Sequence, residues 1–377
     1  MQKKKTGPII VLLSFIIILC FSWLLWIVFG KFVDADNHEN RTKSPRPVFT
    51  IDTFGSYADS YEAYFNDNLP FRNQLVTLNS AIDFFVLNRS TSGSVIKGND
   101  GWLFFAKTLN DYSKNNLYTN VELERIKNDV LKTANYFEDQ GIEFVMFIGP
   151  NKSSIYGDYM PKRYETNSGP SRTEQLVEYL EENTDVKIIF PKDELLVARE
   201  NYPNLVLYQK LDTHWNYMGG YFGTIPLLEA LGIETRDFSE ITYEQINEPD
   251  FYWGGYDLAN MLGLSDILNE DYNYILKGYS DNEVTYEGDT RNSLNDFYGA
   301  VRTQSNSNDY RKIFFARDSF GEAMTPYLAS AFPEIYSVHK SSMTLTRISE
   351  EKPDVLIWES VERDLDMALI NVERWAE

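Results

Sequence analysis

Cysteine and histidine, the residues that form disulfides and most metal sites, are scarce in this sequence. Its 377 residues include one cysteine and three histidines. A single cysteine excludes an intramolecular disulfide, a cysteine-rich zinc site and an iron–sulfur cluster. His38, His214 and His339 leave little room for a histidine-based metal centre. We therefore expect a functional site without a metal or a cofactor.

Basic residues are also scarce. Lys and Arg total 35 against 56 Asp and Glu, which gives a net charge of −21. An acidic surface of this size argues against nucleic acid as a partner. No segment matches a Walker A loop or a Gly-x-Gly-x-x-Gly turn, so nothing in the sequence supports nucleotide chemistry.

Apolar residues are plentiful, at 43% of the chain with 15% aromatic. That composition fills a sizeable core and excludes a globally disordered chain. The length is compatible with two domains or with one large α/β domain.

An uncharged apolar run extends from Pro8 to Phe29 and is long enough to cross a membrane as a helix. Lysines precede the run at positions 3 to 5, and acidic residues begin at Asp34. By the positive-inside rule, we predict a single-pass cell-membrane protein with a cytoplasmic N-terminus and the remainder outside. The alternative is a cleaved signal peptide, but the run exceeds a typical signal core, and Phe29-Gly30-Lys31-Phe32 is a poor cleavage site.

The rest of the chain divides by composition. We predict a cytoplasmic tail and transmembrane signal anchor at 1–31, a linker at 32–50 and an extracellular domain at 51–377. Apolar residues recur at helical spacing across 56–85. Residues 236–310 are rich in Asn, Asp, Tyr and Gly, and they predict a loop-rich insertion able to wall a cleft.

Short apolar runs alternate with amphipathic segments over most of this domain. Strands are predicted at 95–98, 101–105, 143–148, 186–190, 205–208, 313–316, 335–338 and 355–358. Helices are predicted at 121–140 (capped by Asn120), 172–183, 194–199, 217–231, in a segment ending at Phe332, and at 365–375. This alternation favours an α/β fold with helices on both faces of a central, mostly parallel sheet.

Two short segments carry residue types suited to catalysis, each directly after a predicted strand. Sites in open α/β sheets form at the carboxyl ends of strands. In Leu211-Asp212-Thr213-His214-Trp215, residues two apart project to one side, so Asp212 can support His214 as a base. In 315–321, Ser319 supplies a nucleophile, and the amides of Ser319 and Phe320 are candidate oxyanion donors.

Structural and metal-binding readings remain open for each segment taken alone. Asp212 and His214 are compatible with a simple hydrogen-bonded pair, or with metal ligands completed by distant carboxylates. Asp318-Ser319 is compatible with a helix cap. Together, the segments favour the Ser–His–Asp site of a hydrolase or transferase.

The sequence resembles the DHHW family, which is related to the SGNH-like domains of the alginate O-acetylation proteins AlgJ and AlgX. Asp212-Thr213-His214-Trp215-Asn216 resembles the signature, although Thr213 stands at the second position in place of His. Further similar segments are 64–72, 98–104, Pro150-Asn151-Lys152 with Tyr156, 257–262, 317–320, 353–359 and Glu362-Arg363.

This resemblance implies an SGNH-hydrolase-like three-layer sandwich with a triad of Ser319, His214 and Asp212. It also implies an O-acyltransferase, with acetyl as the expected group, that modifies a cell-envelope polysaccharide and has a membrane-bound O-acyltransferase as its donor partner. Candidate substrate-binding residues are Arg317, Lys152, Tyr156, Trp215, Tyr252 and Trp253. Two alternatives are an esterase or deacetylase using the same triad, and a non-catalytic glycan-binding assembly factor.

Overall fold

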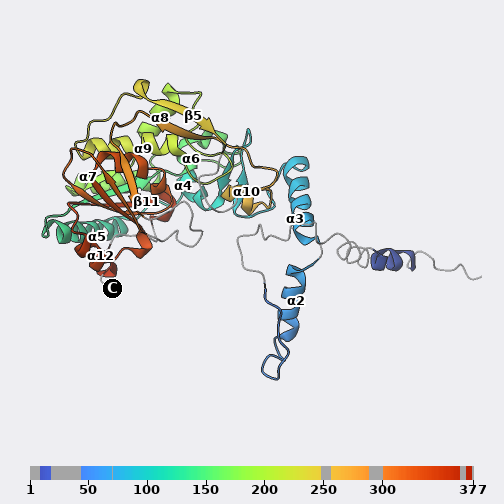
Figure 1. Cartoon of the computed structure of the whole chain (residues 1–377). Helices are drawn as coiled ribbons and strands as arrows, with labels where there is room; N and C mark the ends of the chain where they lie inside the picture. Colours follow the sequence, from blue (N-terminus) through green and yellow to red (C-terminus); the bar gives the residue numbers. More distant parts are fainter. Residues whose placement is uncertain are drawn as a thin grey trace, which may run out of the picture. The chain divides into compact units, whose positions relative to one another are not determined.

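The computed structural model describes residues 9–17, 44–69, 71–247, 256–287, 300–365 and 371–375. The chain forms two compact units. The first comprises Met1–Ser92 and Ala259–Ile267, and the second comprises Gly93–Leu258 and Leu268–Glu377. Figure 1 shows the helices and strands coloured along the chain. The predicted domain boundaries at residues 31 and 50 stay predictions.

The first unit is helical. Helix α2 spans Tyr57–Asp67, α3 spans Arg72–Ala81, and a π-helical turn continues over Ile82–Val86, as the spacing predicts. Residues 9–17 are also helical. Within the described residues, no helix combines the length and apolarity needed to cross a bilayer. The anchor predicted from Pro8 to Phe29 overlaps the described residues only at 9–17, and the rest of it lies outside them.

A seven-stranded sheet forms the centre of the second unit, in the order β4-β3-β11-β9-β10-β8-β7. The first five of these strands run parallel, and β8 and β7 extend one edge antiparallel. Their bounds are β3 Glu143–Gly149, β4 Lys187–Ile189, β7 Val284–Glu287, β8 Val301–Ser305, β9 Lys312–Arg317, β10 Glu334–His339 and β11 Val355–Val361. The mostly parallel sheet predicted from strand–helix alternation is therefore confirmed.

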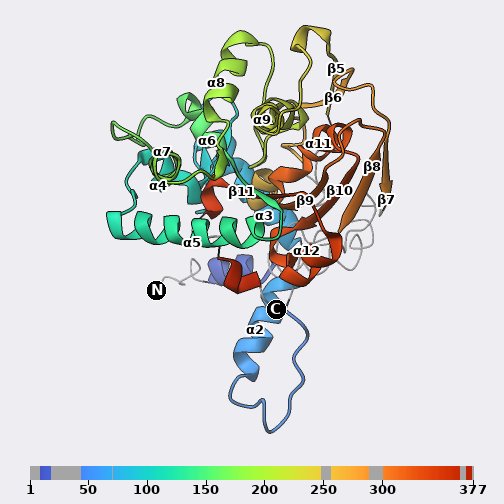
Figure 2. The ribbon, with the colours of Figure 1, turned by 90° about the vertical axis from the view of Figure 1, so that its left-hand side faces the viewer.

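Helices cover both faces of this sheet, because neighbouring residues of each buried strand point to opposite sides. Val145 and Phe147 of β3 belong to a core beneath α8, α9 and α11, whereas Phe144 and Met146 belong to a core beneath α5, α7 and α12. Figure 2 shows α8, α9 and α11 on one side of the strands and α5 and α12 on the other. The helix bounds are α5 Asn120–Glu138, α7 Arg172–Asn183, α8 Lys192–Asn201, α9 Tyr217–Ala230, α11 Thr325–Ala331 and α12 Leu345–Glu351.

The remaining elements are short. Strands β1 Val95–Lys97 and β2 Leu103–Phe105 pair antiparallel, and Asp100 and Gly101 between them both have positive φ, as a tight hairpin turn requires. Helices α4 Leu109–Ser113 and α6 Lys152–Ile155 precede and follow β3 in the surrounding loops. The predicted insertion contributes β5 Thr242–Ile246 paired with β6 Asn273–Lys277, helix α10 Asp257–Met261, and the edge strands β7 and β8.

Two predicted helix details need correction. Helix α5 begins one residue earlier than predicted, because the Thr119 hydroxyl accepts from the Glu122 amide, and Glu122 accepts from the Thr119 amide in return. Of the final helix predicted at 365–375, the structure describes Leu365 as a turn residue and Val372–Trp375 as a 3-10 helix, whereas residues 366–370 lie outside the described part.

The strand predicted at 205–208 does not form, because side chains replace the ladder partners of this apolar run. The Val206 amide donates to the Tyr274 hydroxyl at 3.1 Å, and the Leu207 amide donates to the Tyr156 hydroxyl at 3.0 Å. The Val206 carbonyl accepts from the Asn216 side chain at 2.6 Å. The segment keeps one isolated antiparallel bridge, between Tyr208 and Trp215.

Candidate active site

Ser319 lies in a tight turn that follows the carboxyl end of β9. The buried Asp318 fixes this turn: its carboxylate accepts from the Phe320 amide at 2.9 Å, the Val361 amide at 2.8 Å and the Lys340 ammonium at 2.8 Å. Burial raises the pKa of Asp318, but Lys340 and the amides outweigh it and hold the pKa well below its ordinary value. An ionised Asp318 therefore ties the nucleophile turn to β11.

Asp212 and His214 lie in a loop closed by the Tyr208–Trp215 bridge, and not at the end of a sheet strand as predicted. The Gln209 amide donates to the His214 carbonyl at 3.1 Å, and the Asn216 amide donates to the Leu207 carbonyl at 3.0 Å. These bonds make the loop a short hairpin whose tip carries the two titratable side chains.

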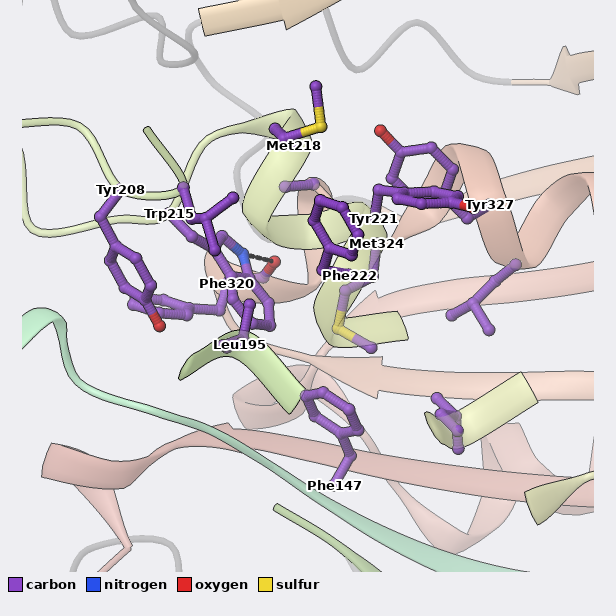
Figure 3. Packing of buried hydrophobic residues seen from close by; sticks show 14 of the residues in the cluster. Phe147, Leu195, Tyr208, Trp215, Met218, Tyr221, Phe222, Phe320, Met324 and Tyr327 are labelled. Atoms are coloured by element: carbon purple, nitrogen blue, oxygen red, sulfur yellow. Dashed lines mark hydrogen bonds between the residues drawn. The ribbon is translucent and has the colours of Figure 1, made fainter. Parts of the chain in front are cut away.

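A direct contact joins the hairpin to the nucleophile turn. The Trp215 indole donates to the Phe320 carbonyl at 2.9 Å, and the two rings lie 5.1 Å apart (Figure 3). Helix α9 packs against both segments through two glycines. A Cβ at Gly219 would lie 2.2 Å from the Leu207 carbonyl oxygen, and one at Gly220 would lie 2.4 Å from that of Ala323. Only glycine allows this close approach.

The structure brings Ser319, His214 and Asp212 within hydrogen-bonding distance. His214 Nε2 lies 2.7 Å from Ser319 Oγ, and His214 Nδ1 lies 2.5 Å from Asp212 Oδ1. Asp212 Oδ1 also accepts from the His214 amide at 3.0 Å, which fixes the carboxylate relative to the ring. The i, i+2 relation predicted from the sequence is therefore present, although its backbone setting is a hairpin tip.

The charges of this group suit proton transfer. Burial raises the pKa of Asp212, but His214 and the backbone amides outweigh it and bring the pKa to about 2. Burial lowers the pKa of His214, but the charge and hydrogen bond of Asp212 raise it overall above its ordinary value. An ionised Asp212 thus strengthens His214 as a base.

A further carboxylate, Asp257, reaches the hairpin tip from the first residue of α10. Its Oδ1 accepts from the Thr213 amide at 2.8 Å, its Oδ2 accepts from the Thr213 hydroxyl at 2.5 Å, and its own amide donates to Asp212 Oδ2 at 2.7 Å. Burial and the nearby Asp212 charge raise the pKa of Asp257 to about 6. Sequence reasoning assigned no role to Asp257, and its place within a family-like segment was the only signal.

Asp212, His214 and Asp257 also have ligand atoms within 4.8 Å of one another, the one such group that could hold an ion among the described residues. The hydrogen bonds given above engage every carboxylate oxygen of this group and both His214 ring nitrogens. The arrangement is therefore a closed hydrogen-bond network.

The other predicted site residues lie mostly inside the protein. Lys152 is buried, and its Nζ donates to the carbonyls of Gln209, Lys210 and Asp212. The buried Tyr156 hydroxyl accepts from the Leu207 amide, and Trp215 is the interior link described above. Tyr252 and Trp253 lie outside the described residues.

Arg317 is buried at the end of β9. Its guanidinium donates to the Ser337 hydroxyl at 3.0 Å and to the Asp318 carbonyl at 3.2 Å, and it contacts Glu322 at 3.2 Å. These bonds tie the end of β9 to Ser337 of β10 and to Glu322, which follows Ser319 in the chain.

The two predicted oxyanion donors differ in availability. The Phe320 amide is engaged by Asp318, so this part of the prediction is wrong. The Ser319 amide has no hydrogen-bond acceptor within the described part of the chain. The half-buried Arg363 also approaches, with its guanidinium 5.1 Å from the Phe320 ring centre, and its charge acts to lower the pKa of His214.

These features define an α/β protein with a Ser–His–Asp group at the carboxyl-end edge of a mostly parallel sheet. The model of the family described as "SGNH hydrolase-like domain, acetyltransferase AlgX" matches residues 95–286, and the chain belongs to this family. The matched region contains Asp212, His214 and Asp257 and ends before Ser319. The resemblance drawn from the sequence motifs is therefore confirmed.

Two solved structures share the fold at low sequence identity, with TM-scores of 0.50 or above. A DHHW family protein from Eubacterium siraeum is 14% identical over 75% of this chain and 98% of its own, with a TM-score of 0.51. Bacillus cereus PatB1 with a sulfonyl adduct is 14% identical over 75% of this chain and 100% of its own, with a TM-score of 0.50. The O-acetyltransferase domain of Pseudomonas putida AlgJ is 17% identical over 73% of this chain and 92% of its own, with a TM-score of 0.45. Comparison with curated protein sequences finds no match.

Proposed function

We propose that this protein is a membrane-anchored, extracytoplasmic O-acetyltransferase that modifies a cell-envelope polysaccharide through an acyl-enzyme on Ser319. The observation that carries the proposal is the contact of 2.7 Å between His214 Nε2 and Ser319 Oγ, with Asp212 behind the imidazole. Membership of the AlgX acetyltransferase family favours acetyl transfer as the reaction.

The chain holds a second Ser–His contact that makes the choice of nucleophile testable. His339 Nδ1 lies 2.7 Å from the Ser341 hydroxyl. Burial lowers the pKa of His339 to about 4, whereas Asp212 helps to raise that of His214. His339 is therefore the weaker proton acceptor, and Ser341 serves as a matched control for Ser319.

In the first half-reaction, His214 Nε2 takes the Ser319 hydroxyl proton while Oγ attacks the carbonyl carbon of an acetyl ester or thioester. The Ser319 amide donates to the resulting oxyanion. As the tetrahedral intermediate collapses, the donor's alcohol or thiol leaves with the proton from His214, and acetyl-Ser319 remains.

In the second half-reaction, the oxygen of a sugar hydroxyl attacks the acetyl carbon of acetyl-Ser319, while His214 takes the proton of that hydroxyl. The bond to Ser319 Oγ breaks, and Oγ recovers the proton from His214. Each cycle moves one acetyl group and consumes no cofactor. Acetyl-CoA is cytoplasmic, so an external domain needs a membrane-bound O-acyltransferase to deliver acetyl groups.

The lysines before the apolar run and the acidic chain after it support an external domain. Protease added to intact cells should degrade the region beyond Lys31 and spare the N-terminal tail. A C-terminal domain that remains protected until the cells are lysed would contradict this topology.

The nucleophile is tested on the full-length chain, purified in detergent and treated with a chromogenic acetyl ester. Mass spectrometry should find the acetyl group on Ser319. Ser319→Ala should abolish turnover without changing thermal unfolding, whereas Ser341→Ala should turn over like wild type. Turnover that survives Ser319→Ala would reject the acyl-enzyme.

Transfer and hydrolysis differ in which hydroxyl attacks acetyl-Ser319, and the triad alone does not decide between them. A transferase must hold its acceptor in attack geometry, where effective molarities reach roughly 10⁵–10⁸ M. We expect a neutral glycan, because the net charge of −21 repels an anionic polymer. Neutral oligomers should raise turnover and yield more O-acetylated sugar than free acetate.

The insertion at 236–310 is our candidate for the acceptor groove. Trp253→Ala should therefore lower transfer to glycan more than it lowers ester hydrolysis. If oligomers never raise turnover and every acetyl group leaves as acetate, the protein is an esterase. If neither reaction occurs although the fold is intact, the glycan-binding alternative gains support.

A further inference from the structure

We propose that Asp257 selects the productive tautomer of His214, by holding the Thr213 hydroxyl proton away from the imidazole. Asp257 is then a positioning residue that acts through Thr213. The inference rests on the proposed function, because it assumes that His214 is the base for Ser319.

The Thr213 hydroxyl lies between two acceptors. Its oxygen is 2.5 Å from Asp257 Oδ2 and 3.3 Å from His214 Nδ1. A hydroxyl has a single proton to donate. While Asp257 is ionised, it is the stronger and closer acceptor, so the Thr213 proton points toward Asp257.

This direction decides where the imidazole proton resides. When the Thr213 hydroxyl proton points toward Asp257, His214 Nδ1 carries the imidazole hydrogen and donates a hydrogen bond to Asp212 Oδ1 at 2.5 Å. Nε2 then presents a lone pair toward Ser319 at 2.7 Å. A general base needs this tautomer, because the opposite one already has a hydrogen on Nε2.

A neutral group at position 257 reverses the arrangement. A protonated carboxyl or an amide donates to the Thr213 oxygen, and the Thr213 proton then turns toward His214 Nδ1. The Thr213 hydrogen then points at Nδ1, where the imidazole usually carries its own hydrogen. Because Nδ1 cannot accept from Thr213 while it is protonated, this arrangement favours the tautomer with hydrogen on Nε2.

Asp257 is ionised above its pKa of about 6. Burial and the Asp212 charge raise this pKa from its ordinary value, while His214, Thr213 and Arg363 act to lower it. Its position is fixed independently of its charge, because its amide donates to Asp212 Oδ2 and its Oδ1 accepts from the Thr213 amide. An amide oxygen also accepts the latter bond, so Asp257→Asn changes the donor pattern while preserving shape.

The first test is a double-mutant cycle on the full-length chain in detergent, with chromogenic ester turnover as readout. Asp257→Asn should lower kcat roughly tenfold or more in the wild-type background and less than about threefold in the Thr213→Val background. Thr213→Ser keeps the hydroxyl and serves as the control in which Asp257→Asn stays costly. An equal loss in all three backgrounds would overturn the proposal and leave Asp257 a purely structural residue.

The second test reads the tautomer directly, by ¹⁵N NMR of histidine-labelled full-length chain at a pH above the pKa of His214. The His214→Gln variant assigns the signals. Wild type should show Nδ1 protonated, and Asp257→Asn should move population to the Nε2-protonated form. Retention of the wild-type tautomer in Asp257→Asn would refute the inference. Because this readout does not depend on turnover, failure of the acyl-enzyme proposal with Ser319→Ala remains a separate outcome.

Discussion

Lys152 was predicted to bind substrate, and the structure permits a sharp test of a different role. Its side chain is buried, and its Nζ lies 3.0, 3.1 and 2.5 Å from the carbonyl oxygens of Gln209, Lys210 and Asp212. These three carbonyls belong to the hairpin that carries the acid and the base. We expect Lys152→Met to destabilise the fold and to leave the KM for a small acetyl ester unchanged.

The magnitude follows from two opposing effects. The substitution leaves three buried carbonyls without their donor, at ~1–3 kcal/mol each. It also removes an ammonium whose burial lowers the pKa from 10.5 to about 8, which corresponds to a penalty of about 3 kcal/mol on the charged form. The lost hydrogen bonds are the larger effect, so the free energy of unfolding should fall by about 3 kcal/mol at pH 7.

The direction in which this stability difference changes with pH is a second, independent prediction. Native Lys152 releases its proton near its lowered pKa of about 8, whereas the unfolded chain holds the proton up to about 10.5. Between these values the unfolded state binds one more proton, so the stability contributed by this residue rises with pH. The stability advantage of wild type over Lys152→Met should therefore grow from pH 8 to pH 10.

Urea unfolding at pH 7 and pH 9.5, together with ester kinetics, tests this reasoning. The neighbouring Lys210 is less buried, with its Nζ 3.5 Å from the Asp100 carbonyl, so Lys210→Met is a matched control with little expected effect on stability. Wild-type stability combined with a raised KM in Lys152→Met would refute a scaffolding role and restore substrate binding.

Three further substitutions test the electrostatics and packing of the site. Asp212→Asn removes the charge that raises the pKa of His214, so the acid limb of kcat/KM should move to lower pH while the plateau falls by up to ~10⁴, the loss known from serine proteases. Arg363→Met should move the same limb to higher pH, because the Arg363 charge acts to lower the pKa of His214; equal midpoints in Arg363→Met and wild type would contradict this. Trp215→Phe leaves the Phe320 carbonyl without its donor and opens a cavity, so thermal or urea unfolding should show a loss of roughly 2–4 kcal/mol.

Periodicity predicted much of the fold, because the buried parallel strands are short apolar runs between clear helices. Periodicity did not predict the order of these strands in the sheet, because pairing partners such as β3 and β11 are far apart in the sequence. The apolar run at 205–208 predicted a strand, yet two of its backbone amides donate hydrogen bonds to the hydroxyls of Tyr156 and Tyr274. A local pattern carries no information about such distant side-chain partners.

The candidate site was predictable where its chemistry is local. Asp212 and His214 are two residues apart, and their contact follows from that spacing. Asp257 was missed as a contributor because an acidic residue in a polar insertion looks like a solvated one. Its hydrogen bonds to Thr213 become visible only in the three-dimensional structure.

The order of strands in the sheet also shapes how the protein must be made. β11 lies between β3 and β9, yet Val355, which pairs with Glu143, is synthesised long after it. One side of β3 therefore stays unpaired until nearly the whole chain has emerged, and sheets with such distant pairings form slowly. An apolar strand with an open edge invites association between nascent chains, so folding should depend on protection until residue 361 is available. A chain ending before Val355 would lack an interior strand of its sheet.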